Sequence, residues 1–133
     1  MSSTDANFNG QIFRKDNPMI LASRRELASI KPIKLAYDAA GYVAGQVLAF
    51  NTSTNMHCKY VNSGSNGTGT AVGILFFDVD VSDFSSSADF KIERGIVGGE
   101  VFYSLLTGID STAITNLGAR RIKTATGNDI LKF

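Results

Sequence analysis

The amino-acid sequence predicts a small, mostly β domain with one short helix late in the chain. Three observations support this prediction. Apolar residues occur in short runs, clusters of Gly, Asn, Asp and Ser separate these runs, and residues 111–117 carry helix-capping residues at both ends. A chain of 133 residues has the size of a single domain, and it buries enough surface to fold without a disulfide or a metal.

The first 34 residues are predicted to form an N-terminal arm and lead-in segment, partly flexible, ahead of a β domain at 35–133. Residues 1–17 are polar, with Phe8, Ile12 and Phe13 as isolated apolar residues. This composition is typical of a segment with little order of its own. Two interpretations stay open, a flexible tail or an arm that orders on a partner through these apolar anchors.

The lead-in segment, residues 18–30, is predicted to form a short helix with Ser23 as its cap, and Pro32 favours extended chain after it. Strands are then predicted along the rest of the chain, bounded by turn-forming residues. They cover residues 33–37, 42–50, 56–61, 71–81, 90–94 and 101–106.

Single positions refine the strand predictions. Gly45 interrupts the second strand and predicts a bulge or a close approach of two backbone segments. Phe90 and Ile92 alternate with Lys91 and Glu93, so we expect the two apolar side chains to face the core and the two charged ones to face solvent.

The stretch from residue 71 to 81 is expected to organise the domain. Its apolar block, residues 72–77, is too short to span a membrane, which needs roughly 20 apolar residues, and it fits a buried strand. Asp78 and Asp80 then alternate with valines, as in a strand that runs along a surface.

The chain offers few groups for chemistry, and no catalytic residue, metal ligand or cofactor is predicted. Asp78, Asp80 and Asp83 could serve a small metal- or carbohydrate-binding domain, but a solvated or inter-subunit face is the preferred interpretation. His57 and Cys58 are neighbours on a predicted strand, so their side chains point to opposite faces and do not form one site.

The charge pattern favours protein partners over nucleic acid. The formal net charge is +1, and the aspartate-rich middle of the chain lies between two basic ends. Arg120 and Arg121 lie in a short basic cluster, which we expect to contact an acidic neighbour, for example Asp78 and Asp80 of another subunit. The polar N-terminus resembles no signal peptide, so synthesis and retention in the cytoplasm are expected.

Several short motifs follow one another in a recognisable order. They are G-Q-V-L at 45–48, A-V-G-I-L at 71–75 with an acidic strand end at 78–81, R-G-I-V at 94–97 before the strand at 100–103, and L-G-A-R-R-I at 117–122. In this order and spacing, residues 35–122 resemble the lambda-type bacteriophage head decoration (capsid cement) protein family.

The resemblance implies a β-clip-like fold of short bent strands and a structural role without enzymatic activity. Such a protein is a homotrimer at the threefold axes of the expanded phage head, on the outer surface of the virion, where it binds the major capsid protein and stabilises the capsid against internal DNA pressure. It is made in the cytoplasm of the host bacterium and binds neither nucleic acid nor membranes directly. The arm residues expected to contact the capsid are Phe8, Ile12, Phe13, Met19 and Ile20. A binding module on a tail or spike is the alternative.

Overall fold

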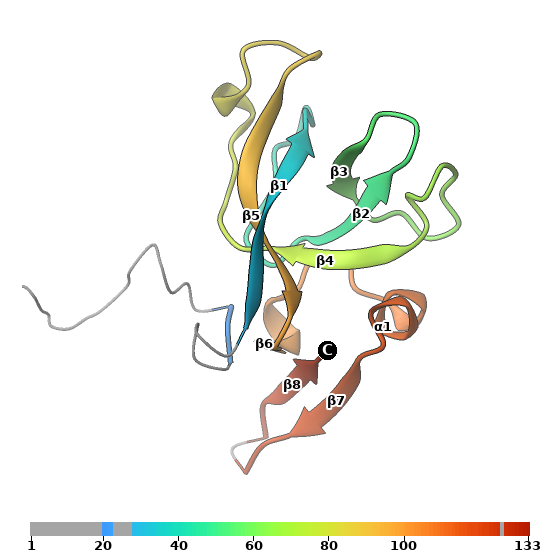
Figure 1. Ribbon diagram of the computed structural model, residues 1–133. Helices are drawn as coiled ribbons and strands as arrows, with labels where there is room; N and C mark the ends of the chain where they lie inside the picture. Colours follow the sequence, from blue (N-terminus) through green and yellow to red (C-terminus); the bar gives the residue numbers. More distant parts are fainter. Residues whose placement is uncertain (1–19, 23–27, 126) are drawn as a thin grey trace, which may run out of the picture.

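The computed structural model describes residues 20–22, 28–125 and 127–133, and it shows a small, mostly β domain (Figure 1). The predicted fold class is therefore confirmed. The described residues form the strands β1 (Ser29–Ala36), β2 (Val47–Asn51), β3 (Met56–Lys59), β4 (Ala71–Leu75), β5 (Phe90–Gly98), β6 (Glu100–Phe102), β7 (Arg120–Lys123) and β8 (Asp129–Lys132), the helix α1 (Ser111–Leu117), and the 3-10 turns η2 (Val81–Asp83) and η3 (Tyr103–Leu105).

Five of the strands close into a barrel in the order β1-β3-β2-β4-β5, and the other three form a small sheet in the order β6-β8-β7. All pairings are antiparallel except that of β1 with β3, which are joined in parallel at Leu35 and His57. This contact between strands far apart in sequence closes the barrel. The side chains of Leu35, Leu48, Ile74, Leu75 and Ile96 are almost fully buried.

The late helix lies where the sequence predicts it. The Asp110 carboxylate accepts a hydrogen bond from the backbone N–H of Ala113 at 2.8 Å and caps α1. The Tyr60 hydroxyl also donates to Asp110, at 3.0 Å, and thereby fastens the helix start to the chain after β3. Gly118 ends the helix in the left-handed conformation, with φ of 67°.

The lead-in segment differs from the sequence prediction. Leu21 forms an antiparallel bridge with Val101 of β6, and Ser29 and Ile30 already belong to β1, so these residues are not helical. Residues 23–27, including the predicted cap Ser23, lie outside the described residues.

The predicted boundary between residues 34 and 35 falls inside β1, which pairs with β5 from Ser29 to Ala36. Residues 29–34 are therefore part of the β domain and not of the arm. Among the described residues β1 meets β3 only at Leu35, so Pro32 sits at an open strand edge, where its missing N–H costs no ladder hydrogen bond.

The prediction that Phe90 and Ile92 face the core is wrong, because their side chains are 42% and 59% exposed. Directly opposite residues of an antiparallel pair share one face of the sheet. Leu35 and Ile33 of β1 point into the barrel, so their β5 partners Lys91 and Glu93 share the inner side and the two apolar residues of β5 point outward. Glu93 and Lys91 form an ion pair at 3.2 Å.

Gly45 lies at a close approach of two backbone segments, as predicted. Its φ is +91°, and a Cβ atom at this position would lie 2.3 Å from the carbonyl oxygen of Leu105. The backbone N–H of Thr107 also donates a hydrogen bond to the Gly45 carbonyl at 3.0 Å. The absence of a side chain therefore lets the chain before β2 pack against the chain after η3.

We predict that Gly45→Ala destabilises the domain more than Gly118→Ala does. Both glycines have positive φ, but a Cβ at Gly118 would meet nothing within 4 Å, so only the left-handed conformation is penalised there, by roughly 1–2 kcal/mol. At Gly45 the Leu105 carbonyl must also move. Urea unfolding of the two variants measures the difference, and equal losses would contradict the close approach.

Candidate interaction surface

The outward side of the β1–β5 ribbon carries apolar and basic side chains together. We call this the outer β1–β5 face and define it by Pro32 and Lys34 of β1 and Phe90, Ile92 and Arg94 of β5. The register pairs Lys34 with Ile92 and Pro32 with Arg94, so these residues lie next to one another. The Lys34 ammonium group also lies 4.2 Å from the centre of the Phe90 ring, within the range of a cation–π contact.

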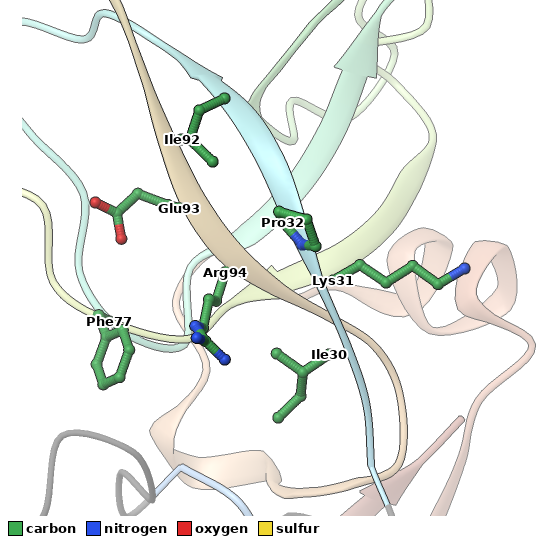
Figure 2. A pocket seen from close by; sticks show the side chains of 7 residues that line it. All are labelled: Ile30, Lys31, Pro32, Phe77, Ile92, Glu93 and Arg94. Atoms are coloured by element: carbon green, nitrogen blue, oxygen red, sulfur yellow. The ribbon is translucent and has the colours of Figure 1, made fainter.

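A groove of about 360 Å³ lies beside this face (Figure 2). Figure 2 shows Phe77 and Ile30 at its lower end, Ile92 at its upper end and the Arg94 side chain between them. Ile30 and Phe77 also pack against the main core cluster, so this part of the groove lining is continuous with the core. The buried residues of that cluster are Ile20, Leu21, Ile74, Phe76, Ile96, Val101 and Leu131. The lining residues are Ile30, Lys31, Pro32, Phe77, Ile92, Glu93 and Arg94.

An exposed apolar strand face of this kind is typical of a surface that binds another macromolecule. Phe90 and Ile92 are neighbours on one face of a regular strand, and basic side chains flank them. An interface core of apolar residues within a polar rim has the same organisation. In the part of the chain that the structure describes, no helix is long and apolar enough to cross a membrane.

The three aspartates that the sequence singled out all form hydrogen bonds with nearby backbone. Asp78 accepts from the N–H of Ala44 at 2.7 Å. Asp80 and Asp83 form a capping box around η2. The Asp83 carboxylate accepts a hydrogen bond from the backbone N–H of Asp80, and the Asp80 carboxylate accepts one from the backbone N–H of Ser82. Hydrogen bonds from the Ser82 side chain and backbone lower the pKa of the Asp80 carboxyl.

These bonds give the aspartates a structural role at the surface, and all three side chains are exposed. Across residues 20–22, 28–125 and 127–133, no group of three or more His, Cys, Asp or Glu side chains is placed to hold a metal ion. The alternative of a metal- or carbohydrate-binding site at these positions therefore gains no geometric support.

The two arginines of the predicted basic cluster on β7 have different surroundings in the structure. Arg121 forms an ion pair with Asp129 of β8, and its guanidinium group lies 4.1 Å from the centre of the Tyr103 ring. Arg120 is exposed. Both side chains reach solvent, but Arg121 is held by contacts within its own chain, whereas no salt bridge of the described residues involves Arg120.

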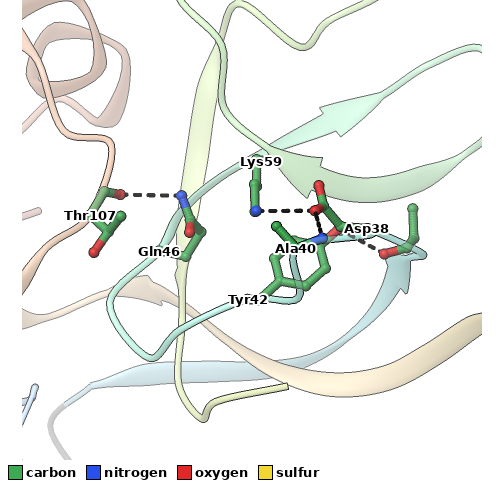
Figure 3. Close-up of polar contacts among 7 residues, drawn as sticks. Asp38, Ala40, Tyr42, Gln46, Lys59 and Thr107 are labelled. Atoms are coloured by element: carbon green, nitrogen blue, oxygen red, sulfur yellow. Dashed lines mark hydrogen bonds and ion pairs between the residues drawn. The ribbon is translucent and has the colours of Figure 1, made fainter. Parts of the chain in front are cut away.

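A polar network that the sequence did not reveal holds the connection between β1 and β2 (Figure 3). The Asp38 carboxylate accepts from the Lys59 ammonium group at 3.1 Å and from the N–H of Ala40 at 2.9 Å. The Tyr42 hydroxyl donates to the carbonyl of Ala36 at 2.7 Å. Burial, and next the negative charge of Asp38, raise the pKa of Tyr42 far above its ordinary value, so this phenol stays protonated and acts as a structural donor.

The buried amide of Gln46 extends this region toward the second half of the chain. Its Nε2 donates to the carbonyl of Thr107 at 3.4 Å (Figure 3). The backbone strengthens the same junction, because Val47 N–H donates to the Thr107 carbonyl at 2.9 Å. These groups join the barrel to the segment before α1 and do not form an open reactive site.

His57 and Cys58 are consecutive residues of β3, so they point to opposite faces as predicted. His57 packs edge-on against Phe50, with ring centres 5.1 Å apart. Its Nδ1 atom is buried and has no hydrogen-bond partner among the described residues. Burial lowers the pKa of His57, because the charged imidazolium is poorly solvated there.

The predicted arm contacts fall into two groups. Phe8, Ile12, Phe13 and Met19 lie outside the described residues. Ile20 is only 4% exposed and packs in the main core cluster with Leu21, so its side chain is already used inside the domain, and its contact with a partner stays a prediction. Its burial fastens the start of the described chain to the barrel.

Comparisons with protein-family models, with curated proteins and with solved structures find no match to this chain.

We predict that the unfolding free energy falls as the pH is lowered through the region where the only histidine titrates. Because the pKa of His57 is lowered from 6.5, the unfolded chain binds the proton first, and stability is lost as the pH falls from above 6.5 toward the folded-state pKa.

Urea unfolding at about pH 7.5 and about pH 5.5 measures this loss, and His57→Gln is the control because it removes the titrating group. The variant should lose less stability than the natural chain over the same interval. An identical pH dependence in both proteins would show that His57 is not the responsible group.

Proposed function

We propose that the chain is a structural virion protein. In this proposal it trimerises at threefold axes of the expanded phage head, binds the major capsid protein on the outer surface, and stabilises the capsid against the pressure of packaged DNA. The proposal starts from the ordered motifs between residues 35 and 122, which resemble the lambda-type head decoration family.

The structural observation that supports it best is the outer β1–β5 face. This surface places Phe90 and Ile92 in solvent on a regular strand, next to the basic side chains of Lys34 and Arg94. Exposing two large apolar side chains is unfavourable for an isolated domain and favourable for a subunit that covers them on assembly. The face thus fits a protein that acts through protein–protein contacts.

A trimeric cement protein would gain its affinity by simultaneous attachment. Three copies held together present three arms to the shell, so each further contact forms at a high effective concentration. Weak individual contacts then give tight overall binding. The polar composition of residues 1–17, with Phe8, Ile12 and Phe13 as anchors, suits such an arm.

Burial of Ile20 and Leu21 makes the arm separable from the domain. Both side chains belong to the main core cluster, and Leu21 bridges to β6. A truncation that stops before them keeps this anchorage. Its effect on binding therefore reports on the arm and not on the stability of the barrel.

We predict that deleting residues 1–17 leaves the domain folded and weakens binding to expanded, undecorated heads by roughly 100-fold or more, because three simultaneous contacts are lost. Co-sedimentation of purified protein with heads measures the affinity, and far-ultraviolet circular dichroism reports the fold.

Deleting only residues 1–6 provides the matched control, since it shortens the arm but retains Phe8, Ile12 and Phe13. This variant should bind like the full chain. If the chain without residues 1–17 decorates heads as tightly as the full chain, the arm has no role in attachment.

A further inference from the structure

We propose that the outer β1–β5 face of one copy docks on an acidic face of a second copy, formed by Val43, Asp78, Asp80 and Asp83. The inference rests on the proposed function and deepens it, because it names the subunit contact within the trimer. It differs from the contact that the sequence predicts, in which the β7 arginines meet the aspartates.

The first of the two surfaces has an apolar centre and basic flanks. Ile92 lies opposite Lys34 in the strand register, and Phe90 lies under the Lys34 ammonium group. No salt bridge within residues 20–22, 28–125 and 127–133 involves Lys34 or Arg94, whereas the neighbouring Lys91 is paired with Glu93. Two cations thus remain on this face to meet acidic groups of a partner.

The second surface is held in place by the bridge between Tyr42 and Val79. Both of these side chains are buried, and their chain neighbours Val43, Asp78 and Asp80 point to solvent. Val43, 46% exposed, is the neighbour of Asp78 across this bridge. The backbone hydrogen bond from Ala44 fixes the Asp78 carboxylate at 2.7 Å.

Asp80 and Asp83 extend the acidic surface beyond the bridge. The capping box of η2 fixes both carboxylates, and both side chains remain exposed. The exposed Val43 lies beside the fixed Asp78, and Asp80 and Asp83 follow further along the chain. This surface is the chemical complement of two exposed apolar residues bordered by two basic ones. Opposite potentials of this kind steer two surfaces together and set their register.

The use of two different surfaces bears on the symmetry of the assembly. Two basic faces or two acidic faces would repel each other, so neither face pairs with its own copy across a twofold axis. When the two faces of one subunit meet the unlike faces of two different neighbours, the contact is head-to-tail, and it closes into a ring when the rotation between subunits permits. A threefold ring is such an assembly, so the contact is compatible with the proposed trimer.

The charge-reversed variant Lys34→Glu tests the basic side, and Ile92→Thr tests its apolar centre while keeping a strand-forming residue. Asp78→Asn together with Asp80→Asn tests the acidic side, because asparagine still accepts the hydrogen bonds of both positions without carrying charge. Lys123→Glu on β7 provides the same charge change as Lys34→Glu away from both faces.

Sedimentation equilibrium of each full-length variant measures self-association, and circular dichroism confirms that each is folded. The natural chain should sediment with three times the mass of one chain. Each of the three face variants should raise the dissociation constant by roughly 10-fold or more, as like-charge contacts and lost apolar burial do at interfaces. The Lys123→Glu variant should associate like the natural chain.

Several outcomes would overturn the inference. A natural chain that is monomeric at all accessible concentrations, face variants that associate unchanged, or disruption by Arg120→Glu but not by Lys34→Glu would each do so. Binding to expanded heads is measured separately. If the natural chain and the face variants decorate heads equally well, the proposed function stands and this contact is ruled out. If the face variants lose the trimer but the natural chain does not bind heads, this contact stands and the proposed function is ruled out.

Discussion

The structure depends on the register between β1 and β5. These strands pair from Ser29 and Gly98 to Ala36 and Phe90, and the pairing fixes which side chains of each strand enter the barrel. A shift of one residue would turn every side chain of a strand to the other face. In the observed register Ile33 and Leu35 fill the interior, so Lys34, Phe90 and Ile92 must lie outside. The surface on which the functional proposal rests is therefore a consequence of how the core is filled.

The elements that could be predicted from the sequence are those with strong local signals. The helix at 111–117 has an aspartate that caps its start and a glycine that takes the left-handed conformation at its end, and both act within a few residues of the helix. Gly45 likewise marks a close backbone approach. The alternation at 78–81 placed the aspartates on the exposed side correctly, because Val79 is buried between them.

The features that could not be predicted depend on contacts between distant residues. Alternation in β5 shows that the strand has two faces, but β1 decides which one is inside. Closure of the barrel through Leu35 and His57, and the burial of Ile20, are equally non-local. For the candidate surface the consequence is direct, since the sequence predicts Phe90 and Ile92 in the core, and it does not reveal that Arg121 contacts Asp129 and Tyr103 of its own chain.

Several aspartates of the described domain serve as fixed hydrogen-bond partners. Asp38 holds the turn between β1 and β2, Asp80 and Asp83 cap η2, and Asp110 caps α1. Tyr42 remains protonated because it is buried beside Asp38. Such groups stabilise loops at the edges of a barrel, and they give a rigid support to the surfaces that another protein would meet.

We propose that this chain works by attaching to a viral shell at symmetric positions. The most direct measurement is electron cryomicroscopy of expanded, undecorated phage heads mixed with the purified full-length protein. We expect added density on the outer surface, centred on the threefold axes and large enough for three copies of the domain. Heads without added density at saturating protein, or density confined to the tail, would contradict it.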